Sequence, residues 1–173
     1  MLLARHRYNV LLERAEDSRR EEKPMRLSLM SALLIWAAAV AAEAGELVSK
    51  PSPHSVGETI DRLEAAVEAA GAKVFARVDH AAAAQSVGSA LRPTQMLMFG
   101  NPKLGTPAIV AAQTAGLDLP LRVLAYEDES GQVMLAYHPP GDLASLHGVP
   151  ADAEVLGAMT GALGKLTDAA VSE

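Results

Sequence analysis

A charge-free apolar run near the start of the chain decides how much of the sequence is available for a folded domain. Leu27 to Ala42 contains no charged residue, and only two serines in it are polar. Arg26 precedes the run, and the tripeptide Ala42-Glu43-Ala44 closes it with a small residue at either end. A basic start, a short apolar stretch and an A-x-A end are the three parts of a secretory signal peptide. The sequence therefore predicts an exported protein.

The length of this run favours a cleaved signal over a membrane anchor. Residues 27–42 are too few for a membrane span, which needs about 20 apolar residues. A buried core helix is a further alternative, but the run lacks the polar face of a surface helix. We therefore expect cleavage after Ala44 and a periplasmic or secreted location. Contact with a membrane is expected only through the signal segment, if cleavage fails.

The residues before the signal do not fit either a signal or a domain. Residues 1–24 mix basic and acidic side chains, unlike the basic start of a signal peptide. Met25 followed by Arg26 is a conventional signal start. We expect translation to begin at Met25, which would make residues 1–24 a mis-annotated extension, residues 25–44 the signal and residues 45–173 a single domain.

The composition of residues 45–173 excludes several classes of function. This part keeps 8 of the 15 basic and 15 of the 21 acidic residues, a net charge of −7. An acidic domain of this kind is unlike a nucleic-acid-binding protein, which needs clustered Lys and Arg to neutralise phosphates. The chain has no cysteine, so disulfides, iron–sulfur clusters, thiolate zinc sites and cysteine nucleophiles are excluded. We therefore expect its stability to rest on aliphatic packing, to which dimerisation could add.

Strands and helices alternate along the domain. Apolar residues recur with period two in the predicted strands and at helical spacing in the predicted helices. The predicted strands are 47–52, 73–79, 94–99, 119–127 and 132–138. The predicted helices are 55–70, 80–87, 106–115, 142–148 and 152–170. Helices between the early strands and a hairpin at the end predict an α+β fold, a mixed and mostly antiparallel sheet with helices on one face.

Local signals fix several element ends. Ser55-Val56-Gly57-Glu58 is a capping box for the first helix, and Gly71 is its expected stop. Thr106-Pro107 is expected to supply the N-cap and first-turn proline of another helix. Met96 and Met98 share one face of a strand that is apolar on both faces towards its end. We interpret them as core residues of an interior strand rather than thioether ligands of copper.

Two stretches together resemble a known family. Phe99-Gly100-Asn101-Pro102-Lys103-Leu104-Gly105-Thr106 is followed at a suitable distance by Leu119-Pro120-Leu121-Arg122-Val123-Leu124-Ala125-Tyr126-Glu127. These stretches are similar to the bacterial and archaeal family called domain of unknown function 302, and the likeness extends over roughly residues 48–171. The resemblance implies a compact α+β domain that is often a homodimer and is frequently secreted or periplasmic. It implies no catalytic residue, because the family has no established activity.

The turn at Gly100-Asn101-Pro102 is the best candidate for a binding site. A strand that leads through glycine into a helix start presents free backbone N–H groups, and helix N-termini attract anions. Asn101 can add an amide donor, Lys103 a positive charge and Thr106 a hydroxyl group. The competing interpretation is a structural turn in which Gly100 adopts a positive φ angle and Asn101 acts as a cap.

Histidines are the other candidates for chemistry. His80 starts a helix directly after a strand, and His138 ends another strand, so we expect both to lie at one edge of the sheet with the turn. His80 is the first choice for an acid or base, since imidazole titrates near neutral pH. No histidine pair has metal-ligand spacing, and no cofactor motif is present, so neither a metal nor a cofactor is expected.

These observations predict a non-enzymatic exported domain that binds a small polar or anionic ligand. The expected ligand-binding residues are Gly100, Asn101, Pro102, Lys103, Thr106, His80 and His138. Two alternatives stay open: an enzyme, a hydrolase or isomerase that uses His80, and a structural or protein-interaction module. A homodimer is expected, because one sheet face or edge needs to be covered.

Overall fold

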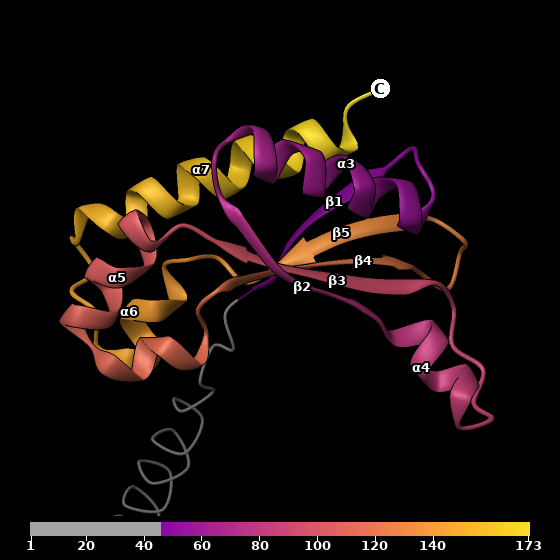
Figure 1. Cartoon of the computed structure of the whole chain (residues 1–173), viewed down its shortest axis with the longest axis horizontal. Coiled ribbons are helices and arrows are strands. Elements are labelled where there is room, and N and C mark those ends of the chain that lie inside the picture. The colour runs from indigo at the N-terminus through magenta and orange to yellow at the C-terminus, as the bar shows by residue number, and fades with distance from the viewer. Residues whose placement is uncertain (1–45) are drawn as a thin grey trace, which may run out of the picture. The chain divides into compact units, whose positions relative to one another are not determined.

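Residues 46–173, which the computed structural model of the chain describes, form a five-stranded sheet with helices (Figure 1). The predicted extension and signal peptide lie outside these residues. The strands are β1 (Val48–Ser52), β2 (Lys73–Asp79), β3 (Thr94–Gly100), β4 (Leu121–Glu127) and β5 (Val133–Tyr137). The helices are α3 (Val56–Ala69), α4 (His80–Ser86), α5 (Pro102–Ala111), the 3-10 helix η1 (Gln113–Leu117), α6 (Asp142–His147) and α7 (Glu154–Val171).

The sheet confirms the predicted α+β fold and corrects one detail. Its strand order is β1-β5-β4-β3-β2, and each neighbouring pair is antiparallel. The sheet is therefore not mixed over the described residues. The reason is the crossover through α3, which carries the chain from one edge strand to the other. As a result, β1 and β2 run in the same direction but never pair.

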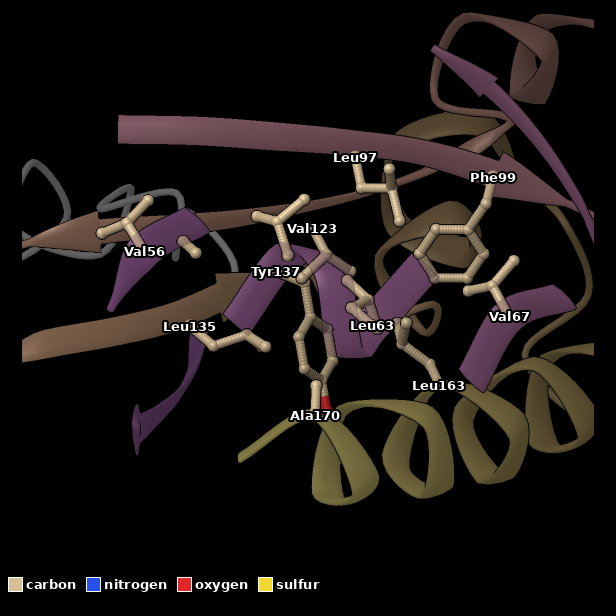
Figure 2. Close-up of a cluster of buried hydrophobic side chains, with 12 residues drawn as sticks. Val56, Leu63, Val67, Leu97, Phe99, Val123, Leu135, Tyr137, Leu163 and Ala170 are labelled. Carbon is tan, nitrogen blue, oxygen red and sulfur yellow. The ribbon is translucent and has the colours of Figure 1, made fainter. Parts of the chain in front are cut away.

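Helices α3 and α7 cover one face of the sheet and enclose the main core (Figures 1 and 2). Ser55 caps α3 as predicted, because its Oγ accepts a hydrogen bond from the backbone N–H of Glu58 at 3.2 Å. The Glu58 carboxylate does not complete the capping box but lies 3.3 Å from Nδ1 of His54. The buried members of this cluster are Val56, Ile60, Leu63, Val67, Leu97, Phe99, Val123, Ala125, Leu135, Tyr137, Leu163 and Ala170.

A second apolar cluster lies under the other half of α7. Its buried members are Ala108, Ala115, Leu143, Val149, Leu156 and Met159. Helix α7 is long enough to pack in both clusters. Leu163 belongs to the first cluster, and Leu156 and Met159 belong to the second. The domain thus has two packed regions that meet along one helix.

The methionines of β3 do not belong to the core. Leu97 and Phe99 are buried against the helices, so Met96 and Met98 project from the opposite face, where they are only partly buried. The prediction that they are core residues was wrong, because the sheet is covered by helices on one face only. The prediction of an interior strand is confirmed, since β3 lies between β2 and β4.

The start of α5 differs from the prediction. The helix is capped by Asn101 and has Pro102 at its first position, whereas Thr106 and Pro107 lie inside it. Asn-Pro supplies the same two signals as Thr-Pro, an N-cap side chain and a proline with no N–H to satisfy, and it comes first after the strand. The helix also ends earlier, at Ala111, and the 3-10 helix η1 follows.

The acidic hairpin tip is ordered by one of its carboxylates. Oδ1 of Asp128 accepts hydrogen bonds from the backbone N–H and hydroxyl of Ser130 and from the N–H of Gln132. These bonds, the Ser130 hydroxyl first, lower the pKa of Asp128 from its ordinary value. Asp128 is therefore a turn-forming residue, in addition to being solvated.

Candidate functional site

A cavity of about 270 Å³ opens beside the predicted turn, at the point where β3 leads into α5. Gly100, Asn101 and Pro102 form one side of it. Further walls come from the end of α3, the segment before β4 and the middle of α7. The candidate turn is thus part of a concave site rather than an exposed loop.

The cavity lies on the seam between the two apolar clusters. Phe99 and Leu163 in its wall belong to the main core, whereas Met159 belongs to the second cluster. Phe99 projects from β3 towards α3, beside Val67 (Figure 2). Two regions that each pack around their own centre leave unfilled space where they meet, and α7 spans that space.

The lining of this cavity is apolar and uncharged. Among the residues that form it, only Asn101 and Thr106 have polar side chains, and none carries a charge. Such a surface provides burial for an apolar molecule and few polar groups for orientation, which is the usual composition of a small-molecule site.

The Asn101 side chain has two polar groups, and only its carbonyl oxygen is used in the fold. Its Oδ1 accepts a hydrogen bond from the backbone N–H of Lys103 at 2.9 Å and so caps α5. This bond fixes the other terminal atom as the NH₂ donor. Within residues 46–173, no hydrogen bond from that donor is found. The amide can therefore cap the helix and donate to a molecule in the cavity at the same time.

Gly100 does not have the conformation expected of a structural glycine turn. It is not among the glycines with positive φ, which in residues 46–173 are Gly71, Gly88, Gly131 and Gly148. A Cβ added at Gly100 would lie 3.5 Å from Cβ of Pro120 and 3.8 Å from Cε2 of Phe75, which are ordinary contacts. The capping part of the structural interpretation is confirmed, and the positive φ angle is not.

Neither of the histidines predicted to join this site lines the cavity. Lys73 pairs with Gly100 and Asp79 pairs with Gln95, so His80 follows the end of β2 that is farther from the turn. Strand β5 runs opposite to β2, which places His138 at the other end of the sheet from His80. The expectation that both histidines share one edge was wrong, because it ignored the direction of each strand. His138 does lie at the same end of the sheet as the turn, since β5 runs in the same direction as β3. Lys103 is exposed and is not part of the cavity lining.

A second, smaller cavity of about 90 Å³ contains His138 together with Asp118, Arg122 and Asp142. Nδ1 of His138 lies 3.6 Å from the Asp142 carboxylate. Asp118 bridges two elements, since its carboxylate contacts Nε2 of His147 at 2.6 Å and also pairs with Arg122. No local pattern indicates this pair, because Asp118 follows η1 whereas His147 lies in α6.

The Asp118–His147 contact predicts a pH dependence of stability. The hydrogen bond from His147 lowers the pKa of Asp118 below 3.8, with the Arg122 charge adding to it and burial opposing it. A lowered folded-state pKa stabilises the protein above the unfolded value and loses this effect as the pH falls through the folded value. In urea titrations, Asp118→Asn should therefore be less stable than the wild type at about pH 5, with a difference that shrinks towards about pH 3. A difference that is the same at both pH values would contradict this account.

The described part of the chain shows neither a metal-binding cluster nor a membrane-spanning helix. Residues 46–173 contain no group of three His, Asp or Glu side chains placed to hold a metal ion together. No helix in this range is both long and apolar enough to cross a membrane.

A solved structure shares this fold. The crystal structure of an uncharacterized conserved protein DUF302 from Bacillus stearothermophilus matches with a TM-score of 0.65 at 21% sequence identity. The match covers 72% of this chain and 97% of that chain.

Curated relatives are similar over a comparable length. The chain is 45% identical over 117 residues to "Fluoride-specific ion channel FluC 1" of Brucella suis biovar 1 (strain 1330), covering 66% of this chain and 46% of that protein. The protein of the same name from Brucella abortus biovar 1 (strain 9-941) is also 45% identical, with 43% of its length covered. The chain thus spans less than half the length of these relatives.

The family itself is identified by its own sequence pattern. Residues 48–166 match the family described as "Domain of unknown function DUF302". This range runs from the start of β1 into α7 and includes both motif stretches, the turn before α5 and the strand after Leu119-Pro120. Because the match covers most of the chain and agrees with the observed fold, this protein belongs to the DUF302 family.

Proposed function

We propose that this protein is an exported, non-enzymatic domain that binds a small molecule in the cavity beside Asn101. The observation that carries the proposal is the pairing of an apolar, uncharged cavity with a helix-capping amide whose NH₂ group has no partner within residues 46–173. The ligand has an apolar body and one hydrogen-bond-accepting group, such as a carboxylate or carbonyl oxygen, directed at that amide.

The cavity volume limits the size of the ligand. An apolar cavity of about 150 Å³ is large enough for benzene, and typical ligand pockets start at about 300 Å³. A volume of about 270 Å³ therefore suits roughly one or two fused rings or a short acyl chain. Burial of that apolar body supplies most of the affinity, and the amide supplies orientation.

The lining changes the class of ligand expected from the sequence. A bare anion needs a positive charge or several converging donors, whereas the cavity offers no charged side chain and two polar ones. The cavity thus favours an amphiphilic molecule over a polar or anionic one. For the same reason, the fluoride named in the Brucella relatives is not the ligand proposed for this cavity.

The modular occurrence of the fold supports a binding role. This chain covers 97% of the Bacillus stearothermophilus chain but less than half of the Brucella proteins. A domain that occurs both nearly alone and within longer proteins can bind the same ligand in each of these settings. The enzyme alternative gains no support, since His80 lies at the far end of β2 from the cavity.

Two substitutions at Asn101 separate its capping role from its binding role. Asn101→Asp keeps an N-cap oxygen but removes the NH₂ donor, so stability should stay near the wild-type value while affinity for naphthalene-2-carboxylate falls by about tenfold or more. Asn101→Ala removes both groups, and should also lose about 1 kcal/mol of stability. Isothermal titration calorimetry and urea unfolding measure the two effects.

Naphthalene without the carboxylate is the matched control ligand. Its weaker binding should be nearly the same in the wild type and in Asn101→Asp, because it has no group for the amide to contact. If Asn101→Asp binds naphthalene-2-carboxylate as tightly as the wild type does, Asn101 is only a cap and this assignment fails.

A further inference from the structure

A β-bulge in β2 directs the Phe75 side chain to the face of the sheet that carries the cavity. Val74 pairs with Phe99 and Ala76 pairs with Met98, so Phe75 is an extra residue on its strand. Phe99 projects towards α3 (Figure 2), whereas Met98 lies on the opposite face. Because side chains alternate along a strand and a bulge interrupts that alternation, Val74 and Phe75 both lie on the helix-covered face. The bulge therefore brings Phe75 into the cavity wall.

Phe75 lies where the cavity opens to solvent. Its side chain lines the cavity and is nevertheless 50% exposed, whereas Phe99, the other aromatic residue of the wall, is 2% exposed. A Cβ added at Gly100 would lie 3.8 Å from Cε2 of Phe75, so the ring lies against the turn that precedes Asn101. A ligand whose apolar body fills the buried part of the cavity would leave its polar group at this opening.

A positive charge lies at the same opening. Nζ of Lys73 lies 5.3 Å from the centroid of the Phe75 ring, which is a cation–π contact. The backbone of Lys73 pairs with Gly100, and the preceding residue, Ala72, lines the cavity. Lys73 is therefore held beside the opening by its strand position as well as by its side chain, although it is not part of the lining.

The charge of Lys73 is not used by an ion pair within residues 46–173. Arg77 on the same strand differs, since it pairs with Asp61 and Glu64 of α3. Residues 45–173 carry a net charge of −7, so most of this surface repels anions. A cation without an acidic partner beside an apolar opening is a local exception, and it favours an anionic group at that point.

We propose that Lys73 is a specificity residue of the cavity and that the ligand is an amphiphilic carboxylate rather than a neutral carbonyl compound. This inference rests on the proposed function and narrows it. The apolar body of the ligand occupies the cavity. The carboxylate lies at the opening, where it accepts a hydrogen bond from the Asn101 amide and faces the Lys73 ammonium group. Both groups adjoin Gly100, since Asn101 follows it in the chain and Lys73 pairs with it across the sheet.

Naphthalene-2-carboxamide is the matched neutral ligand, because it keeps the rings and the carbonyl acceptor but carries no charge. In calorimetry, the wild-type protein should bind naphthalene-2-carboxylate more tightly than the carboxamide. The ratio of the two affinities should fall by about twofold to fivefold in Lys73→Gln, as expected for an exposed ion pair, and further in Lys73→Glu. Affinity for the carboxamide should stay unchanged in both variants.

A control variant and a change of salt concentration complete the test. Lys165→Gln makes the same substitution at an exposed residue of α7 outside the cavity lining, and it should keep the wild-type ratio. Raising the ionic strength to about 1 M should lower the ratio in the wild type but not in Lys73→Gln, because salt screens exposed charges.

Two kinds of failure are distinguishable. Equal affinity of the wild type for both ligands, or a preference for the carboxylate that survives in Lys73→Gln, would overturn the role of Lys73 and leave the cavity as a binding site. If the wild type binds neither ligand, the proposed function fails, and this inference fails with it.

Discussion

Replacing Ala162 by phenylalanine should abolish binding of naphthalene-2-carboxylate while the domain stays folded. Ala162 lies on α7, is partly buried, and contributes to the cavity wall. A benzyl group at this position occupies the space that the ligand needs, and it fills a void rather than displacing packed neighbours. We expect stability near or above the wild-type value in urea unfolding, together with no detectable heat of binding in calorimetry.

Ala158→Phe is the matched control for this prediction. It makes the same change on the same helix, but Ala158 is exposed and lies outside the cavity lining. This variant should bind the ligand as the wild type does. If both variants bind equally well, the ligand occupies some other site, and the cavity is a packing defect without a binding role.

Shortening Leu163 should have the largest effect on stability. The side chain is 1% exposed and packs in the main core (Figure 2). It also lines the cavity at the seam with the second cluster. Truncation of a buried leucine to alanine destabilises a protein by about 2–5 kcal/mol, depending on how far the site collapses. The cavity already present limits that collapse, so we expect Leu163→Ala to fall in the upper half of this range.

Urea unfolding of Leu163→Ala is best compared with Leu146→Ala. Leu146 is 67% exposed, so its truncation should change the free energy of unfolding by less than about 0.5 kcal/mol. An equal, small effect for both variants would mean that α7 does not join the two clusters in the manner described. A domain of this size has about 5–15 kcal/mol of stability in total, so the loss expected at Leu163 is readily measured.

The positions of most helices and strands could be predicted because their signals are local. Ser55 caps α3, Asp79 caps α4 by accepting the N–H of Ala82 at 2.9 Å, and the hairpin between β4 and β5 turns at Gly131. Side-chain caps and positive-φ glycines act within a few residues, so the sequence alone contains them. Helix α5 is the exception. Both Asn101-Pro102 and Thr106-Pro107 have the residues of a helix start, and no local pattern indicates that the helix begins at the first of them.

The candidate site was predicted only in part because it depends on long-range arrangement. The turn at Asn101 was recognised from its residues, and it does border a cavity. The other walls come from Ala72 after α3, from Pro120 before β4 and from Leu163 on α7. Their meeting point depends on the gap between two packed clusters, which no local pattern encodes. The grouping of His80 with His138 failed for a related reason, since it required the direction of every strand.

A two-dimensional NMR titration of the purified protein with naphthalene-2-carboxylate locates the ligand on the domain. If the ligand binds in the cavity, the largest shifts of backbone amide signals should occur at Gly100, Asn101 and Ala162, which surround it, and His80 should stay unaffected at the far end of β2. Shifts that cluster around His80 or on the sheet face opposite α3 and α7, with none at the cavity residues, would contradict binding in the cavity.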